Sequence, residues 1–264
     1  MLSIGTTFNY DIPLKTQLPM IKAAGFTHIS LGGGNLEHSG YLNITGQRNL
    51  KEMIQDSGLK ICSIHAPFKD VDVSSPEKSI SLNAMDLLKR CIDSALFLGA
   101  KTIIFHPVSI SRVDSIEDRK EILLKQVYSL LEYIGKKDIQ LAIENLPSGL
   151  INDLVYFSLD RIDNSKYGLC YDSSHDNLLS EPLTILGKYG NRLFTTHISD
   201  NRGEKDDHIL PFEGTFKWDE FTKVFHKIGF EGIFLLEVEM RRSAFQKPQE
   251  FLNEAFKRAQ ILLK

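Results

Sequence analysis

The stretch LAIENLP at residues 141–147 decides the fold that we expect for this chain. It is a short apolar run that ends in a carboxylate, Glu144, and burying such a group without compensation is costly. Five other runs have the same design: ICSIHAP (61–67), TIIFHP (102–107), YGLCYDSSHD (167–176), LFTTHISD (193–200) and IFLLEVE (233–239). Strands that repeatedly end in a metal-binding residue indicate one site to which many strands contribute.

Longer segments of helical pattern alternate with these apolar runs along the chain. The pattern predicts strands at 2–8, 26–31, 60–65, 101–106, 139–144, 167–171, 193–198 and 232–237. It predicts helices at 15–24, 46–57, 77–98, 115–135, 149–162, 181–189, 218–228 and 247–263. A glycine is expected to terminate five of these helices: Gly58, Gly99, Gly135, Gly190 and Gly229. Eight strand–helix units predict an α/β protein with a parallel sheet that closes into a single (β/α)8 TIM barrel.

Bulk composition limits the class of protein. The 264 residues are close to the roughly 250 typical of one barrel, and no break in composition divides residues 1–264, so we expect a single domain. An odd count of three cysteines, without paired spacing, is typical of reduced packing residues in a cytoplasmic protein. The start MLSIGTTFNYDI lacks a signal-peptide pattern, and no apolar run approaches the roughly 20 residues of a membrane helix. A net charge of −3 argues against a dedicated nucleic-acid binder.

The residues at the strand ends form a mixed nitrogen and oxygen set that suits Zn, Mn, Co or Mg. They are His65, His106, Glu144, Asp172, His175, His197 and Glu237. Any one of these histidines, taken alone, is more simply explained as an ordinary polar residue at a barrel end, and only the repeated pattern favours a metal site. The segment DDHILPFEGTFKW (206–218) adds Asp206 and His208, which either hold a further metal or belong to a polar turn.

Alternation along the strands supports one inward-facing site, because side chains at i and i+2 share a face. A small residue lies two positions before each of four polar strand ends, which suits a crowded barrel interior. The pairs are Ser63 with His65, Ala142 with Glu144, Cys170 with Asp172, and Thr195 with His197.

Several blocks together resemble a known superfamily. They are HAPF (65–68), FHP (105–107), ENLP (144–147), DSSH (172–175), HISDN (197–201), and DDH, EGT and W within 206–218. The chain resembles the xylose-isomerase-like TIM-barrel superfamily, and its sugar phosphate isomerase/epimerase branch especially. That superfamily includes sugar isomerases and epimerases, inosose and dehydroshikimate dehydratases, and nucleases of the endonuclease IV type. The resemblance covers nearly the whole chain but is weak for any single reaction.

The epimerase pattern implies one divalent metal, held by Glu144, Asp172, His197 and Glu237. The resemblance further implies that the two glutamates exchange protons with the substrate. His175 would contact substrate hydroxyls. Arg202 and Glu239 are further candidates for substrate binding, although Arg202 lies one residue closer to His197 than its counterpart does in the epimerases.

The endonuclease IV pattern implies a larger ligand set and up to three zinc ions. To the four residues above it adds His65, His106, His175, Asp206 and His208, and all of these positions are filled. We expect a second metal near His65, His106, Asp206 and His208. The parts that contact DNA depart from the nuclease pattern, because the loop GGGNLEHSGYLN (32–43) lacks basic and aromatic groups near its start and ENLPS (144–148) replaces ENTAG.

Three hypotheses follow. The first is a divalent-metal-dependent isomerase or epimerase that acts on a sugar or sugar phosphate through a metal-stabilised enediolate, with Glu144 and Glu237 as acid and base; a sugar-derived dehydratase with the same site is chemically close. The alternative is a zinc-dependent phosphodiester hydrolase of the abasic-site endonuclease type. The third is a catalytically silent barrel that senses a metal or ligand. We expect a small polyhydroxylated substrate in preference to duplex DNA, while the oligomeric state is left open.

Overall fold

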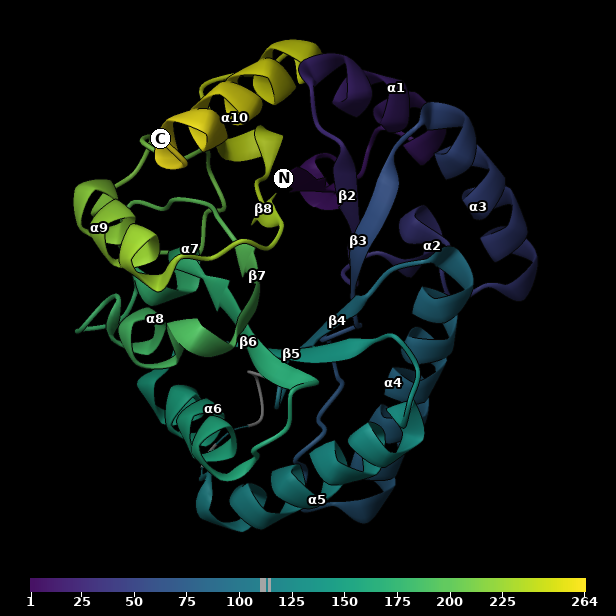
Figure 1. The fold of residues 1–264 in the computed structure, drawn as a ribbon, viewed down its shortest axis with the longest axis vertical. Coiled ribbons are helices and arrows are strands. Elements are labelled where there is room, and N and C mark those ends of the chain that lie inside the picture. Colours follow the sequence, from purple (N-terminus) through teal and green to yellow (C-terminus); the bar gives the residue numbers. More distant parts are fainter. Residues whose placement is uncertain (110–112, 114) are drawn as a thin grey trace.

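The computed structural model describes residues 1–109, 113 and 115–264 of the chain. Its centre is a sheet of eight parallel strands in the order β7-β6-β5-β4-β3-β2-β1-β8 (Figure 1). The strands are β1 (Leu2–Gly5), β2 (His28–Leu31), β3 (Lys60–His65), β4 (Thr102–Phe105), β5 (Gln140–Glu144), β6 (Tyr167–Asp172), β7 (Leu193–His197) and β8 (Phe234–Leu236). All neighbours in this order are parallel, as strand–helix alternation predicts.

The sheet closes on itself between β7 and β8. One side of β8 pairs with β1 in regular register, with Ser3 opposite Leu235. On its other side, isolated parallel bridges join Thr195 to Ile233 and Ile198 to Leu236. The predicted (β/α)8 TIM barrel is therefore confirmed.

The helices form a ring around the strands (Figure 1). They are α1 (Leu14–Ala24), α3 (Ile44–Ser57), α4 (Lys78–Leu98), α5 (Glu117–Ile134), α6 (Gly149–Arg161), α8 (Thr184–Tyr189), α9 (Trp218–Ile228) and α10 (Pro248–Leu262). Gly58, Gly99 and Gly229 end their helices in the left-handed region, where glycine has no steric penalty. α8 also ends directly before Gly190, as predicted, but Gly190 has a φ of −57° and the chain continues into a 3₁₀ turn, η3 (Gly190–Arg192).

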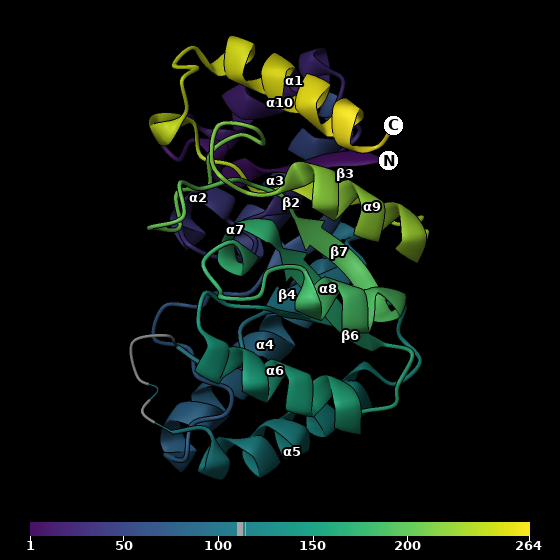
Figure 2. The ribbon, with the colours of Figure 1, turned by 90° about the vertical axis from the view of Figure 1, so that its left-hand side faces the viewer.

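Two short helices that the sequence pattern does not predict lie at the carboxyl end of the strands. They are α2 (Leu36–Ser39) and α7 (Ser173–Asp176), and Figure 2 shows both at the end of the barrel opposite the two termini. The predicted strand 2–8 stops at Gly5 and continues as a 3₁₀ turn, η1 (Thr6–Phe8), and a third such turn, η4 (Met240–Arg242), follows β8. No helix in the described part of the chain has the length and apolar character needed to span a bilayer.

Two hydrophobic layers hold the barrel. The larger layer fills the space between the strands and the surrounding helices. The smaller one lies inside the barrel, where Ile104, Ala142, Cys170 and Leu235 are fully buried and Phe194 packs against them. The three cysteines are buried and unpaired, as expected of packing residues. The inner layer supports the polar side chains one step further along the same strands.

Candidate metal centre

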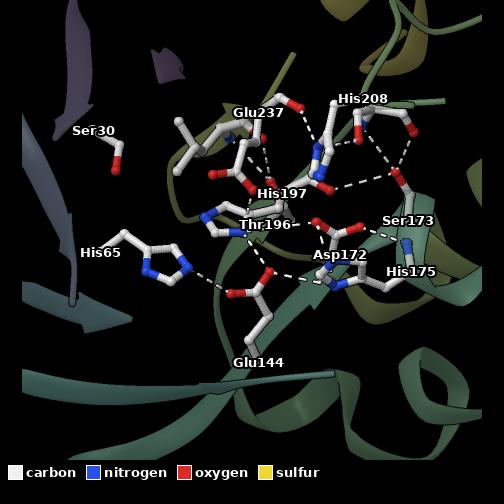
Figure 3. A network of polar contacts seen from close by, with 12 residues as sticks. Ser30, His65, Glu144, Asp172, Ser173, His175, Thr196, His197, His208 and Glu237 are labelled. Atoms are coloured by element: carbon white, nitrogen blue, oxygen red, sulfur yellow. Dashed lines mark hydrogen bonds and ion pairs between the residues drawn. The ribbon is translucent and has the colours of Figure 1, made fainter. Parts of the chain in front are cut away.

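The carboxyl ends of five strands direct polar side chains toward one another (Figure 3). His65, Glu144, Asp172 and His197 are the last residues of β3, β5, β6 and β7, and Glu237 directly follows β8. Parallel strands in a closed barrel end on one face, so residues far apart in the sequence meet there. Contacts of 2.8 to 3.8 Å connect all nine residues named as ligands from the sequence.

Glu144 is the centre of these contacts. Its Oε2 lies 2.9 Å from His65 Nε2 and 3.1 Å from His106 Nε2, and its Oε1 lies 2.8 Å from His197 Nδ1. Burial by itself would raise the pKa of this carboxyl, but the nearby charges of His197 and His106 hold the pKa well below its usual range. Glu144 is therefore a buried carboxylate whose closest charged or polar partners are imidazoles.

His197 joins Glu144 to two further carboxylates. Its Nδ1 lies 3.0 Å from Glu237 Oε2 and 3.8 Å from Asp172 Oδ2. The pKa of Asp172 is raised to about 6, chiefly by burial. Asp172 Oδ2 is buried and, among the described residues, has no hydrogen-bond partner. A buried carboxylate oxygen in this state is costly unless something else binds it.

These four residues fit a divalent metal ion. One ligand atom from each of Glu144, Asp172, His197 and Glu237 lies within 4.8 Å of the others. Carboxylate oxygens with imidazole nitrogen are ligands that Zn, Mn and Co accept. The Asp172 oxygen that lacks a hydrogen bond is the observation that most directly supports a bound cation.

Two further groups of candidate ligands lie beside this tetrad. The second group is His65 and His106 on Glu144, and the third group is His175, Asp206 and His208. Asp206 Oδ2 is 3.1 Å from His175 Nε2 and 2.9 Å from His208 Nε2. The four residues expected to share a second metal therefore divide between two groups, because His65 and His106 contact Glu144 whereas His208 contacts Asp206. The division follows from the fold, since the two pairs come from β3 and β4 on one side and from the loop after β7 on the other.

Backbone carbonyl groups orient three of the histidines. The Nδ1 atoms of His65, His175 and His208 lie 2.7, 2.8 and 3.1 Å from the carbonyl oxygens of Ala66, Asn145 and Glu237. A carbonyl oxygen only accepts, so each Nδ1 carries the proton and donates it. Each Nε2 then donates to a carboxylate oxygen when it carries a proton, and without that proton its lone pair is free to bind a cation, which is the arrangement usual for metal-binding histidines.

Asn145 supports the site and was not identified from the sequence. Its side chain accepts from the Asp172 amide at 2.8 Å and donates to the Asp172 carbonyl at 2.9 Å. It thus fixes the backbone of one ligand while its own carbonyl oxygen orients another, His175. The signal available was its place in ENLP, directly after Glu144.

A cavity of about 350 Å³ opens onto these residues. Tyr10, Gly34 and Phe68 line it together with the candidate ligands, and the Phe68 ring lies 5.1 Å from His106 and 5.4 Å from His65. A Cβ at Gly33 would collide with the backbone of Ala66, so a side chain there would block this close approach of two loops. The cavity therefore combines carboxylates and imidazoles with the aromatic rings of Tyr10 and Phe68.

The two predicted substrate contacts outside the ligand set have different positions. Glu239 lines the cavity, and Arg241 Nε donates to its Oε2 at 2.7 Å. Arg202 is half exposed on the loop after β7, where its guanidinium lies 3.4 Å from Asp207, and it is not among the lining residues. A substrate contact of Arg202 stays a prediction.

Comparison with known proteins agrees with this fold. The model for the family described as xylose isomerase-like TIM barrel matches residues 18–256, and the chain belongs to that family. The protein y4fM of Sinorhizobium fredii is 29% identical over 262 residues, covering 88% of this chain and 83% of the relative. A probable endonuclease 4 of Mycoplasmopsis agalactiae is 23% identical over 190 residues, covering 64% and 66%.

Solved structures show the same fold at low sequence identity. A D-tagatose 3-epimerase-like protein superposes with a TM-score of 0.82 at 18% identity, covering 99% of this chain and 97% of that one. The IOLI protein with a bound zinc atom superposes with a TM-score of 0.80 at 17% identity, covering 99% and 96%. At this level of identity the likeness establishes shared architecture, and fold alone does not establish activity.

Proposed function

We propose that the protein is a metal-dependent isomerase or epimerase that acts on a sugar or sugar phosphate. The observation that carries the proposal is the convergence of Glu144 and Glu237 on the same nitrogen, His197 Nδ1, at 2.8 and 3.0 Å. Both glutamates also line the cavity. Two carboxylates beside one small substrate can exchange protons with it, one as base and the other as acid.

In this proposal Glu144, Asp172, His197 and Glu237 hold the divalent ion. When bound, the ion would act as a Lewis acid that polarises the substrate carbonyl and stabilises the negative charge left by proton removal. The buried Asp172 Oδ2, which has no hydrogen-bond partner among the described residues, supports a cation at this position.

The proton-transfer roles follow from the positions of the two glutamates. Glu237 is the more exposed, with 18% of its side chain accessible against 1% for Glu144. We assign Glu237 as the base that removes a proton beside the carbonyl, and Glu144 as the second member of the acid–base pair, which must take up a proton before it can return one. The pKa of Glu237 is about 2, because burial is outweighed by the charges of His197 and His208, so it is ionised near neutral pH.

The cavity supports a small substrate. A volume of about 350 Å³ lies at the lower end of the roughly 300–1,000 Å³ of ligand pockets. Arg202, Arg241 and Arg242 near its mouth have acidic partners in Asp207, Glu239 and Asp207. Phosphate contacts dominate affinity for DNA and require available cations along a surface. Arginines that already have acidic partners are less available for such contacts, which favours a small substrate over duplex DNA. The names of the epimerase-like neighbours are consistent with a sugar.

One observation favours a second candidate, a zinc-dependent phosphodiester hydrolase. Two further groups of candidate ligands lie next to the tetrad. One is His65 and His106 beside Glu144, and the other is His175 and His208 beside Asp206. Clustered metal ions can generate hydroxide and stabilise a leaving oxygen. The distant relatives named as probable endonuclease 4 agree with this candidate.

The decisive experiment compares the two chemistries directly. The protein, loaded with Zn²⁺, Mn²⁺ or Co²⁺, is incubated with ketoses and their phosphates in deuterated water, and separately with a duplex that contains an abasic site. We expect deuterium at the carbon beside the carbonyl and no strand cleavage. Cleavage at catalytic protein concentrations without deuterium in any sugar would replace the proposal with the hydrolase. Loss of water from the sugar would identify a dehydratase.

A further inference from the structure

Asp200, three residues after the end of β7, is a fully buried carboxylate that plays no part in the ligand set. Five N–H groups donate to it. The backbone amides of Asn201 and Phe216 reach Oδ1 at 2.8 and 3.1 Å. The amides of Phe212 and Gly214 and the indole Nε1 of Trp218 reach Oδ2 at 3.1, 3.0 and 2.9 Å. In the described part of the chain, N–H groups and not a cation compensate this buried charge.

All five donors belong to one segment, residues 201–218, which leads from β7 to the first residue of α9 and lines the cavity through Asp206 and His208. The same segment carries Asp206 and His208. The backbone of Asp200 pairs with Ile209 in both directions, at 2.8 and 2.9 Å, directly beside His208. Asp200 therefore forms hydrogen bonds with the start, the middle and the end of this segment.

The conformation of this segment requires such support. His208 and Phe212 have φ values of 49° and 71°, in the left-handed region that non-glycine residues rarely adopt. A Cβ at Gly214 would collide with Asn201 O and with Asp200 Oδ1, so the loop closes tightly over the carboxylate. These features place His208 Nε2 and Asp206 Oδ2 within 2.9 Å of each other.

We propose that Asp200 is a positioning residue that presents Asp206 and His208 to the cavity and thereby makes the third ligand group, with His175, able to hold a metal ion. The inference rests on the metal-binding part of the proposed function. Asp200 acts through the loop and touches neither substrate nor metal. The tetrad depends less on this loop, because Glu144, Asp172 and His197 end strands and Glu237 follows β8, where only its backbone carbonyl accepts a hydrogen bond from His208.

The test is Asp200→Asn, which keeps the shape of the side chain. The new NH₂ group must face at least two of the five N–H donors, whichever way the amide turns, and those donors lose their acceptor. We expect Zn²⁺ bound per protein to fall by the ion of the third group while the tetrad ion is retained. Affinity at the third group should drop by about tenfold to a hundredfold, as for other residues that orient ligands.

Trp218 provides a second readout, because it is the only tryptophan in the chain and its indole donates to Asp200. We expect its emission to move to longer wavelength in Asp200→Asn as the loop loosens. Gly214→Ala displaces the same loop without changing any charge and should reproduce the selective metal loss. It also keeps the test usable if Asp200→Asn folds poorly.

Two controls separate positioning from general destabilisation. Trp218→Phe removes one donor of five and should keep both ions. Asp160→Asn removes a half-exposed carboxylate at the end of α6, and should leave metal content unchanged. Equal metal content and affinity in Asp200→Asn and the wild-type protein would overturn the proposal, as would parallel loss of both ions or a wild-type protein that binds one ion only. Deuterium exchange into ketoses tests the proposed function separately, so an active one-metal protein would refute this inference alone.

Discussion

Two adjacent layers inside the same barrel have opposite chemistry. Ala142 and Cys170 belong to a dry apolar layer with Ile104 and Leu235. Two residues further along β5 and β6, Glu144 and Asp172 are equally buried but carry carboxyl groups, and their partners are other candidate metal ligands. The lower layer stabilises the barrel through packing, whereas the upper layer costs stability unless neighbouring histidine charges or a bound cation compensate it. The candidate functional residues are therefore separated from the apolar packing layer by only two residues along each strand.

The largest effect that would test this comparison is expected for Glu144→Gln. The amide cannot act as an acid or base, and it places an NH₂ group against histidine nitrogens. We expect turnover to fall at least about 10²- to 10⁴-fold. Metal content, measured by mass spectrometry, should fall with it, while circular dichroism remains that of a folded barrel. Wild-type turnover and metal content in this variant would refute the assignment.

In the apolar layer we expect a substitution to lower stability and to leave metal binding and activity largely unchanged. Ile104→Ala leaves a void among fully buried neighbours, and such changes cost about 2–5 kcal/mol. The measurement is the free energy of unfolding in urea on the metal-free protein. Metal content and activity per folded molecule should stay close to wild type. If metal affinity collapsed together with stability, the two layers would not be separable.

Metal addition should stabilise the protein through the upper layer alone. An ion at a hundred times its dissociation constant stabilises the folded state by about 2.7 kcal/mol, provided that it does not bind the unfolded chain. We expect a higher melting temperature with Zn²⁺ than with a chelator in both the wild-type protein and Ile104→Ala. The shift should be smaller or absent in Glu144→Gln, and an equal shift in all three proteins would point to binding elsewhere.

The smallest effect is expected at the opposite end of the barrel. Lys101 Nζ lies 2.6 Å from Asp138 Oδ2, but both side chains are largely exposed, at 68% and 80%. Water and salt screen such a pair, so Asp138→Ala should change neither the melting temperature nor the metal content measurably. A clear loss of stability would show that short ion pairs matter in this barrel even where water reaches them.

Local patterns identified much of the candidate site. Glu144, Asp172 and His197 stand at the ends of apolar runs, and a run of this kind signals a strand whatever the rest of the chain does. The role of Asn145 was not predictable in this way, because its side chain bonds to the backbone of Asp172, 27 residues later. The role of Asp200 was not predictable either, because its hydrogen-bond donors lie in a loop whose sequence has no periodicity.

The sequence by itself determined the alternation of strands and helices, the barrel, and the identity of the polar residues at its mouth. Periodicity and strand ends are local properties, so they survive without coordinates. Only the tertiary structure decided how those residues divide, with His65 and His106 on Glu144 and with His175 and His208 on Asp206. Such groupings depend on the register between strands, including the shift between Leu169 and Cys170, and on loops held by distant partners. Neither the strand register nor the loop conformation can be predicted from a short stretch of sequence, because each arises from contacts that form when the barrel closes.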